Sequence, residues 1–211
     1  MTARGYDRKV APVTGTTTRG AKTRQALLDA ARERFARDGY RATSVADISR
    51  DAGVGGTTAF VHFDNKEALF FAAVDDDLGS LFDELGVELA SLGPEGQLPD
   101  RLLATVLAVI ERHPLARRLL AGLEPDVTER VLETESFASL RRAVAELLAE
   151  GQQGGSVRPD LPPEHLADGL VAVVVAVAMA SVQIGPAVPE AFGPGVATVF
   201  RGLLTPDPRA G

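Results

Sequence analysis

The fold of this chain is decided by residues 43–63, which read TSVADISRDAGVGGTTAFVHF. Thr43 or Ser44 supplies the kind of side-chain oxygen that caps a helix N-terminus. Apolar residues then recur with helical spacing, at Val45, Ile48 and Ala52. Gly53 follows where a tight turn needs a residue that tolerates positive φ, and a second short helix is expected over residues 55–62. Two short helices joined by a glycine turn are the helix-turn-helix pattern.

The segments on either side of this pattern also have helical spacing. A helix is expected from Thr23 until Gly39 stops it, and a long helix is expected from Asp64 to about position 92. Asp64 and Glu67 have the spacing of a capping box at the start of that long helix. Residues 1–20 contain threonines and glycines without apolar periodicity, so we expect a disordered arm there.

The rest of the chain is expected to form further helices. A glycine- and proline-containing break at residues 93–96 ends the long helix. Helices are then expected over residues 99–112, 114–121, 125–151, 163–184 and 189–204. No stretch alternates in the manner of a strand. The sequence therefore predicts an all-α protein, with an N-terminal three-helix unit and a C-terminal helical body.

Composition excludes several classes of protein. The 211 residues contain no cysteine, which excludes disulfides, thiolate zinc sites and a cysteine nucleophile. The three histidines are far apart in the sequence, and we expect neither a metal nor a cofactor. The longest apolar run, Leu170–Ile184, has 15 residues, fewer than the ~20 that cross a bilayer. The charged N-terminus is not a secretory signal, so we expect a cytoplasmic protein without membrane contact.

The net charge of −7 is unevenly distributed. Residues 1–66 contain 12 Lys and Arg against 7 Asp and Glu, a net charge of +5. Residues 67–211 contain 10 against 22, a net charge of −12. A basic head on an acidic body indicates that only the head contacts a polyanion, although compositional noise is an equally good explanation of the charge alone.

Individual residues add to what the spacing indicates. The informative positions are Ala26 to Ala31, Phe35, Gly39, Tyr40, Thr43, Ser44, Val45, Asp47, Ile48, Ala52, Gly53, Val54, His62, Phe63 and Lys66 to Phe70. Within residues 22–75 these positions resemble, in register and without a gap, the tetracycline-repressor (TetR) family of bacterial transcriptional regulators.

The resemblance implies a homodimeric, all-helical regulator. It implies a DNA-binding domain over residues 21–81, with the helix-turn-helix at about 44–63, and a ligand-binding and dimerisation domain over residues 82–211. In such proteins a small molecule binds the second domain and releases the first from an operator. The implied partners are double-stranded operator DNA and an unidentified small-molecule effector. Repression is the usual mode in the family, and a two-fold dimer implies a palindromic operator.

The candidate DNA-contacting residues follow from the same pattern. The second helix would enter the major groove, while polar side chains around it contact phosphates. The candidates are Thr43, Ser44, Gly55, Gly56, Thr57, Thr58, Val61, His62 and Lys66. Compared with the family, Gly55 and Gly56 lack side chains at the helix start, and Phe60 lacks the hydroxyl with which a tyrosine reaches a phosphate. We therefore expect readout through thymine methyl groups and DNA shape rather than arginine–guanine pairs.

Several of these residues also have a structural interpretation. Thr43 and Ser44 are helix caps first and phosphate contacts second. His62 is otherwise a half-buried structural histidine, and Lys66 a solvated cation. The large apolar residues nearby are expected in the core, namely Phe35, Tyr40, Val45, Ile48, Val54, Phe60 and Phe63.

The C-terminal body can be interpreted in outline. The apolar helix 163–184 and the helix 189–204 are expected to form a four-helix dimer interface, the alternative being a monomeric core helix. A ligand cavity is expected among the helices. Its candidate lining residues are Leu107, Ile110, His113, Arg117, Phe137, Leu140, Val175, Met179 and Gln183.

Two other functions compete with DNA-dependent regulation. An enzyme is not expected, because the chain contains no nucleophile elbow, zinc-protease, P-loop or dinucleotide motif. The acidic run Asp75-Asp76-Asp77 cannot converge on a metal, because residues one and two apart point to different faces of a helix. The second alternative is a small helical protein that binds an apolar ligand and keeps a vestigial DNA-binding domain.

Overall fold

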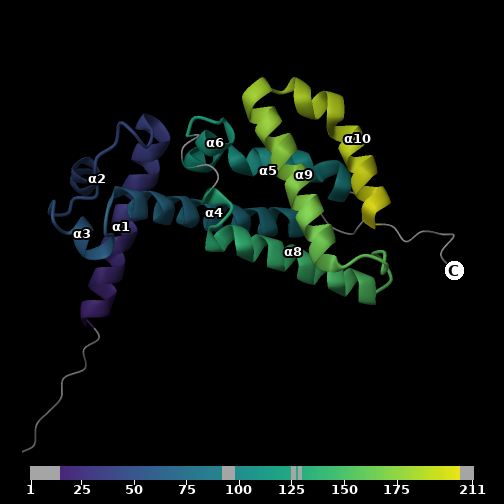
Figure 1. The fold of residues 1–211 in the computed structure, drawn as a ribbon, viewed down its shortest axis with the longest axis horizontal. Coiled ribbons are helices and arrows are strands. Elements are labelled where there is room, and N and C mark those ends of the chain that lie inside the picture. The colour runs from purple at the N-terminus through teal and green to yellow at the C-terminus, as the bar shows by residue number, and fades with distance from the viewer. Residues whose placement is uncertain (1–14, 92–97, 125–126, 128–129, 205–211) are drawn as a thin grey trace, which may run out of the picture.

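The computed structural model describes residues 15–91, 98–124, 127 and 130–204. Its helices are α1 (Gly15–Asp38), α2 (Val45–Asp51), α3 (Ala59–His62), α4 (Lys66–Ser91), α5 (Leu98–Ile110), α6 (Pro114–Leu120), α8 (Glu135–Gln153), α9 (Pro163–Ile184) and α10 (Ala187–Leu204). No strand occurs among the described residues, so the all-α prediction is confirmed. In Figure 1, α1, α2 and α3 gather at one end, and α4 runs from them into the body formed by the other helices.

α1 is longer than the sequence predicts. It begins at Gly15 rather than Thr23, so the prediction of a disordered arm is wrong for residues 15–20, while residues 1–14 lie outside the described part. An existing helix can propagate outward without an apolar stripe, because each added residue gains a backbone hydrogen bond without a new nucleus. The predicted end is confirmed, since Gly39 has a φ of 85° and donates its N–H to the Phe35 carbonyl at 2.9 Å.

α4 uses a different cap from the predicted one. The side-chain oxygen of Asn65, not Asp64, accepts the N–H of Ala68 at 2.8 Å, so the helix begins at Lys66. Glu67, the expected partner in a capping box, instead pairs with Arg130. Asp64 and Asn65 are adjacent, and both have side chains suited to capping a helix. The sequence alone does not distinguish between them.

One hydrophobic core joins the helix-turn-helix unit to the body. Phe35 and Phe70 are fully buried with their ring centroids 4.9 Å apart in an edge-to-face arrangement. The same core continues through Leu78 to Val109 and Leu115 of the body helices. The apolar side chains of α4 therefore pack against both the helix-turn-helix unit and the body.

Of the two longest predicted C-terminal helices, one is divided and the other has the predicted bounds. The expected helix 125–151 is interrupted, because the hydroxyl of Thr134 accepts the N–H of Phe137 and starts α8 at Glu135. α9 has the predicted bounds, and with 22 residues it is long and apolar enough, by length and composition alone, to cross a membrane, although its uninterrupted apolar run has only 15 residues. Only 22% of its most apolar window is buried within one chain, although it packs against α8 and α10. A helix of this kind in a soluble protein needs a partner surface.

Candidate nucleic-acid interface

α2 is fixed by a cap at its start and an ion pair at its end. The Ser44 hydroxyl accepts the N–H of Asp47 at 3.2 Å and donates to the Asp47 carboxylate, which lowers the pKa of that carboxyl. Arg34 of α1 holds Asp51 with Nη2 and Oδ1 3.0 Å apart, and this hydrogen bond lowers the pKa of Asp51. α2 is thereby oriented against α1 as the bracing helix of the pair.

Thr43 is a structural residue. Its side chain is buried, and its hydroxyl donates to the Gly39 carbonyl at 2.8 Å. The capping and packing role of Thr43 is therefore visible in the structure, whereas its phosphate contact stays a prediction. Its neighbour Ser44 is exposed and caps α2 as expected.

The second helix of the motif is shorter than predicted. Residues 55–58 form a turn in which Thr58 donates its N–H to the Gly55 carbonyl at 2.8 Å, and α3 proper begins at Ala59. Two adjacent glycines explain the late start, because glycine loses the most backbone entropy on entering a helix. Gly55, Gly56 and Thr57 are exposed at the leading edge of this turn.

α3 presents an apolar outer face. Ala59 is fully buried and anchors the helix, whereas Phe60 is 56% exposed and Val61 is 80% exposed. The prediction that Phe60 is a core residue is wrong. Adjacent residues of a helix point to different faces, so Phe60 points outward when Ala59 points into the core. Exposed Phe and Val beside exposed Thr57 form a surface suited to thymine methyl groups.

Lys66 lies next to this surface, at the start of α4. Its ammonium is 4.4 Å from the centroid of the Tyr40 ring and donates to the Arg41 carbonyl at 3.5 Å. His62, at the end of α3, is half-buried and lies beside Phe63, with ring centroids 6.4 Å apart. Both predicted phosphate-binding side chains are thus at the border of the exposed α3 face.

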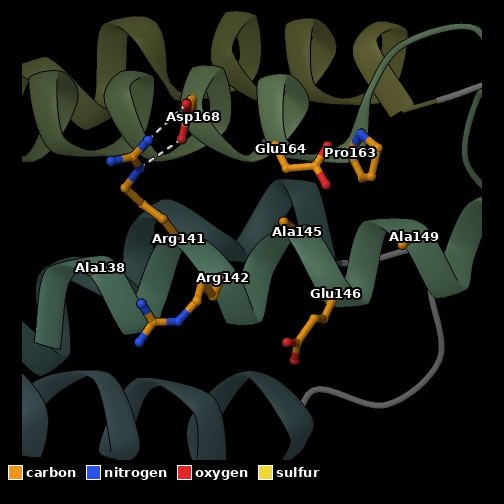
Figure 2. A pocket seen from close by; sticks show the side chains of 9 residues that line it. All are labelled: Ala138, Arg141, Arg142, Ala145, Glu146, Ala149, Pro163, Glu164 and Asp168. Atoms are coloured by element: carbon orange, nitrogen blue, oxygen red, sulfur yellow. Dashed lines mark hydrogen bonds and ion pairs between the residues drawn. The ribbon is translucent and has the colours of Figure 1, made fainter. Parts of the chain in front are cut away.

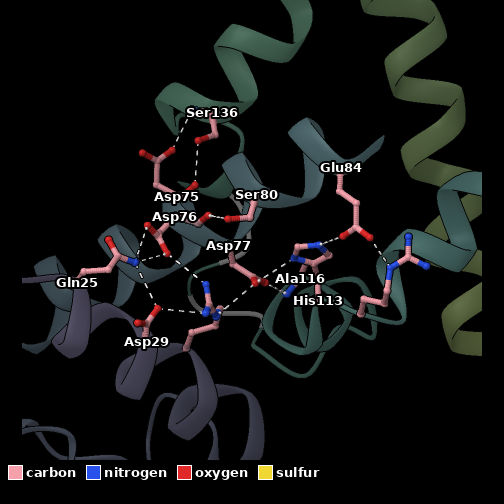
Figure 3. A network of polar contacts seen from close by, with 12 residues as sticks. Gln25, Asp29, Asp75, Asp76, Asp77, Ser80, Glu84, His113, Ala116 and Ser136 are labelled. Atoms are coloured by element: carbon pink, nitrogen blue, oxygen red, sulfur yellow. Dashed lines mark hydrogen bonds and ion pairs between the residues drawn. The ribbon is translucent and has the colours of Figure 1, made fainter. Parts of the chain in front are cut away.

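The acidic run of α4 connects three other helices (Figure 3). Asp75 accepts the N–H of Ser136 at 2.8 Å and so caps α8. Asp76 pairs with Arg32 of α1 at 3.2 Å. Asp77, fully buried, accepts the N–H of Ala116 at 2.9 Å and so caps α6. The three carboxylates point to different faces as expected, and no cluster suited to a metal occurs among the described residues.

His113 belongs to this polar network rather than to a ligand cavity. Its Nδ1 is 3.2 Å from the Asp77 carboxylate, and its Nε2 is 3.0 Å from the Glu84 carboxylate. Which nitrogen donates depends on the tautomer of the ring. The hydrogen bond from His113 lowers the pKa of Glu84, with a further contribution from Arg112. Both ring nitrogens thus have protein partners, and the ligand contact predicted for His113 stays a prediction.

The other two polar ligand candidates are also engaged by the protein. Arg117 pairs with Glu111, with Nε and Oε1 3.0 Å apart. Gln183 of α9 donates its side-chain amide to the Leu120 carbonyl at 2.8 Å and so ties α9 to the end of α6. Each of these two residues, like His113, is thus bound to a different group of the protein.

Two hollows open elsewhere on the molecule. A groove of about 440 Å³ lies between α8 and α9, where Arg141 reaches across to Asp168 (Figure 2). Its lining residues are Ala138, Arg141, Arg142, Ala145, Glu146, Ala149, Pro163, Glu164 and Asp168. A hollow of about 300 Å³ lies between the end of α1 and the end of α6. Neither hollow contains any of the nine residues predicted to bind ligand.

Sequence reasoning missed the contacts that join α6 to its neighbours. Arg118 and Glu124 hold the end of α1, and Asp77 caps α6 across 39 positions of sequence. The nearest sequence signal is Pro114, which begins a helix and leaves its first N–H groups in need of an acceptor. Nothing in the spacing names the acceptor, because it comes from another helix.

The fold and this surface define a helix-turn-helix DNA-binding protein. The capped helix α2 precedes the exposed helix α3, and Lys66 follows α3 in the sequence. Residues 1–66, which include both helices, carry a net positive charge. This arrangement places the exposed helix where it can enter a major groove.

Comparisons with known proteins identify the family. Residues 27–73 match the sequence model of bacterial regulatory proteins of the tetR family, and residues 93–204 match that of the C-terminal domain of SbtR-like transcriptional regulators. The second match covers more than half of the chain. The chain therefore belongs to the TetR family and is a DNA-binding transcriptional regulator. Regulators of this family are dimeric and bind DNA operators and effector ligands.

Individual relatives agree with this assignment. The transcriptional repressor Rv1474c of Mycobacterium tuberculosis is 30% identical over 148 residues, covering 69% of this chain and 75% of the relative. The regulator UidR of Escherichia coli K12 is 26% identical over 202 residues, covering 89% and 96%. The crystal structure of a TetR-family transcriptional regulator from Mesorhizobium loti has the same fold, with a TM-score of 0.67, 21% identity, and coverage of 89% and 98%.

Proposed function

We propose that this regulator is a repressor that binds an inverted-repeat operator as a homodimer. The observation that carries the proposal is the exposed face of α3, where Phe60 and Val61 are turned outward while Ala59 anchors the helix. Thr57 and Val61 touch base edges, and His62 and Lys66 bind phosphates on either side. The helix offers few hydrogen-bonding groups, so sequence is read mainly through methyl contacts and groove shape.

Dimerisation is proposed to occur through α9 and α10. α9 is strongly apolar, yet Ala172 and Ala176 are exposed in one chain. Larger apolar side chains are exposed on the same two helices, at Ile184, Phe192 and Val199. A second copy of this chain would bury these groups in a four-helix interface, and small alanine side chains favour close approach of the helices.

The helical body is proposed to bind the effector. Five of the predicted residues are half-buried rather than closed into the core: Leu107, Phe137, Leu140, Val175 and Met179. α4 supports coupling to DNA, because Asp75, Asp76 and Asp77 bind α8, α1 and α6 from one turn of the same helix that begins at Lys66. The proposed site of action is the cytoplasm, where operator DNA is available.

The alternative of an apolar-ligand carrier with a vestigial DNA-binding domain gains no support. The groove between α8 and α9 and the hollow beside α1 are both lined in part by charged side chains, including Arg141 and Arg118. The α3 surface, in contrast, is exposed and fully formed.

Selection from a random-sequence duplex library tests the proposal. The purified full-length chain should enrich an inverted repeat, with half-sites separated by about one helical turn or more. The matched control is Val61→Asp, which places a negative charge on the α3 face and should enrich nothing. Enrichment of single, unpaired half-sites would contradict the dimeric part of the proposal, and failure to enrich any sequence would contradict sequence-specific binding.

A further inference from the structure

A polar contact closes the junction between the helix-turn-helix unit and the body. Arg118 lies on α6, and Glu124 follows shortly after that helix. They form an ion pair with Nε and Oε1 2.7 Å apart, and their side chains are only 21% and 8% exposed. Partial withdrawal from water strengthens such a pair relative to one on the open surface.

The pair also holds the end of α1. Glu124 Oε1 accepts the N–H of Tyr40 at 3.0 Å, and Arg118 Nη1 donates to the Ala36 carbonyl at 3.4 Å. Both side chains lie against Gly39, where an added Cβ would collide with the Arg118 guanidinium and lie 2.8 Å from Glu124 Oε1. We call the Arg118–Glu124 pair and the backbone of residues 36–40 that it holds the α1 clasp.

The clasped backbone leads directly to the DNA-facing groups. The Tyr40 ring carries the Lys66 ammonium. The Gly39 carbonyl accepts the hydroxyl of Thr43, which directly precedes Ser44, the cap of α2. A displacement of the clasp therefore reaches both the phosphate-binding lysine and the start of the bracing helix through one or two contacts.

The clasp lies at the open edge of the junction. On the inner side, Leu115 and Leu119 of α6 belong to the shared hydrophobic core. On the outer side, a hollow of about 300 Å³ borders the clasp, with Arg41 and Leu123 on its wall. At this outer edge the clasp joins α1 to α6 by polar contacts, in addition to the apolar packing on the inner side.

We propose that the Arg118–Glu124 pair is a positioning element that sets the angle of the helix-turn-helix unit on the body. In the homodimer of the proposed function, on which this inference rests, that angle fixes the separation of the two recognition helices. The pair therefore determines which half-site spacing is bound, not which bases are read. It also gives α6, whose start is held by Asp77 of α4, a direct connection to α1.

Binding to duplexes of graded spacing tests this role. The probes are the selected inverted repeat, versions with one or two base pairs added or removed between the half-sites, and a single half-site. The variants are Arg118→Met, Glu124→Gln and the double variant. The control is Arg141→Met, which removes a pair of equal length but greater exposure between α8 and α9, with Nε and Oδ1 2.7 Å apart. Each affinity is measured at one salt concentration, because phosphate contacts make affinity salt-dependent.

The wild type and the control should bind one spacing best. Arg118→Met should lose about tenfold in affinity at that spacing, a change within the usual range of coupling between sites. Its affinity for the single half-site should stay within about twofold of the wild type. The dependence of affinity on spacing should therefore become flatter. The double variant should be no worse than Arg118→Met, because the two side chains act as one unit. An unchanged profile in Arg118→Met, or equal losses on the full site and the half-site, would overturn the positioning role. A wild type without a spacing preference would instead overturn the proposed function, and the positioning role with it.

Discussion

Among single residues, Lys66 is positioned by contacts with uncharged groups. Its ammonium rests on the Tyr40 ring and the Arg41 carbonyl, neither of which is an anion. The ring and the carbonyl restrict the side chain, so less conformational entropy is lost when it meets a phosphate. The full positive charge remains for the DNA backbone.

Lys66→Ala should weaken binding to the operator and to unrelated DNA alike. One phosphate contact is lost, so the slope of log affinity against log salt should become shallower by about 0.9. Fluorescence anisotropy over a salt series measures both quantities. Arg101→Ala, which removes an exposed charge from α5, is the control and should leave the slope unchanged. A Lys66 variant that changes sequence preference but not the slope would contradict the phosphate role.

Glu84 should make the stability of the protein sensitive to acid. Its pKa is lowered in the folded state by His113 and Arg112, so its stabilising contribution is complete above the unfolded pKa and is lost as pH falls through the folded pKa. The urea midpoint of the wild type should therefore fall between about pH 5 and pH 3 more steeply than that of Glu84→Gln. Asp83→Asn, which removes an exposed carboxylate one position away on α4, is the matched control for the loss of a negative charge. Identical profiles for the wild type and Glu84→Gln would contradict this account.

At the scale of elements, the sequence predicted the existence of helices better than their ends. Apolar spacing located α2, α4 and α9, and Gly39 ended α1 where expected. The boundary errors arose where neighbouring residues offer equivalent local chemistry, as with Asp64 and Asn65, or where helix propagation needs no apolar stripe, as in residues 15–20. The turn at residues 55–58 was mistaken for helix because its two glycines lower helix stability without forbidding it.

The cap of α4 can be tested with two adjacent substitutions. Asn65→Ala should destabilise the protein by about 1 kcal/mol, because it removes the acceptor of the Ala68 N–H. Asp64→Ala should change the free energy of unfolding by less than about 0.5 kcal/mol, since Asp64 is exposed and precedes the cap. Urea denaturation measures both values. A larger loss for Asp64→Ala than for Asn65→Ala would restore the assignment made from sequence.

At the scale of the whole molecule, sequence located the DNA-facing unit but not the contacts that connect it to the body. The helix-turn-helix is local, so the Ser44 cap and the Gly53 turn follow from adjacent residues, although the exposure of Phe60 does not. His113 and Gln183 were predicted to bind ligand because both are polar residues near apolar helices. In the structure they instead bind Glu84 and the Leu120 carbonyl, across 29 and 63 positions of sequence. Partners of that kind are set by helix packing, which a single sequence does not specify.

The proposed dimer makes a prediction at the same scale. Ala176 is exposed on α9, and Ala176→Arg would place a charge within the proposed interface. The variant should be monomeric at micromolar concentration, where the wild type is dimeric, as measured by sedimentation velocity. Ala143→Arg, on the exposed face of α8, should remain dimeric. A wild type that sediments as a monomer would refute the α9–α10 interface.

The exposed α3 face is proposed to bind a specific duplex through two protomers at once. The most direct test is a titration of the selected inverted repeat and of a scrambled duplex of equal length, followed by anisotropy across a range of salt concentrations. The account predicts two protomers per inverted repeat, an affinity at least about 10³-fold higher than for the scrambled duplex, and a steep fall of both affinities with salt. Equal affinity for the two duplexes, or binding that does not respond to salt, would contradict it.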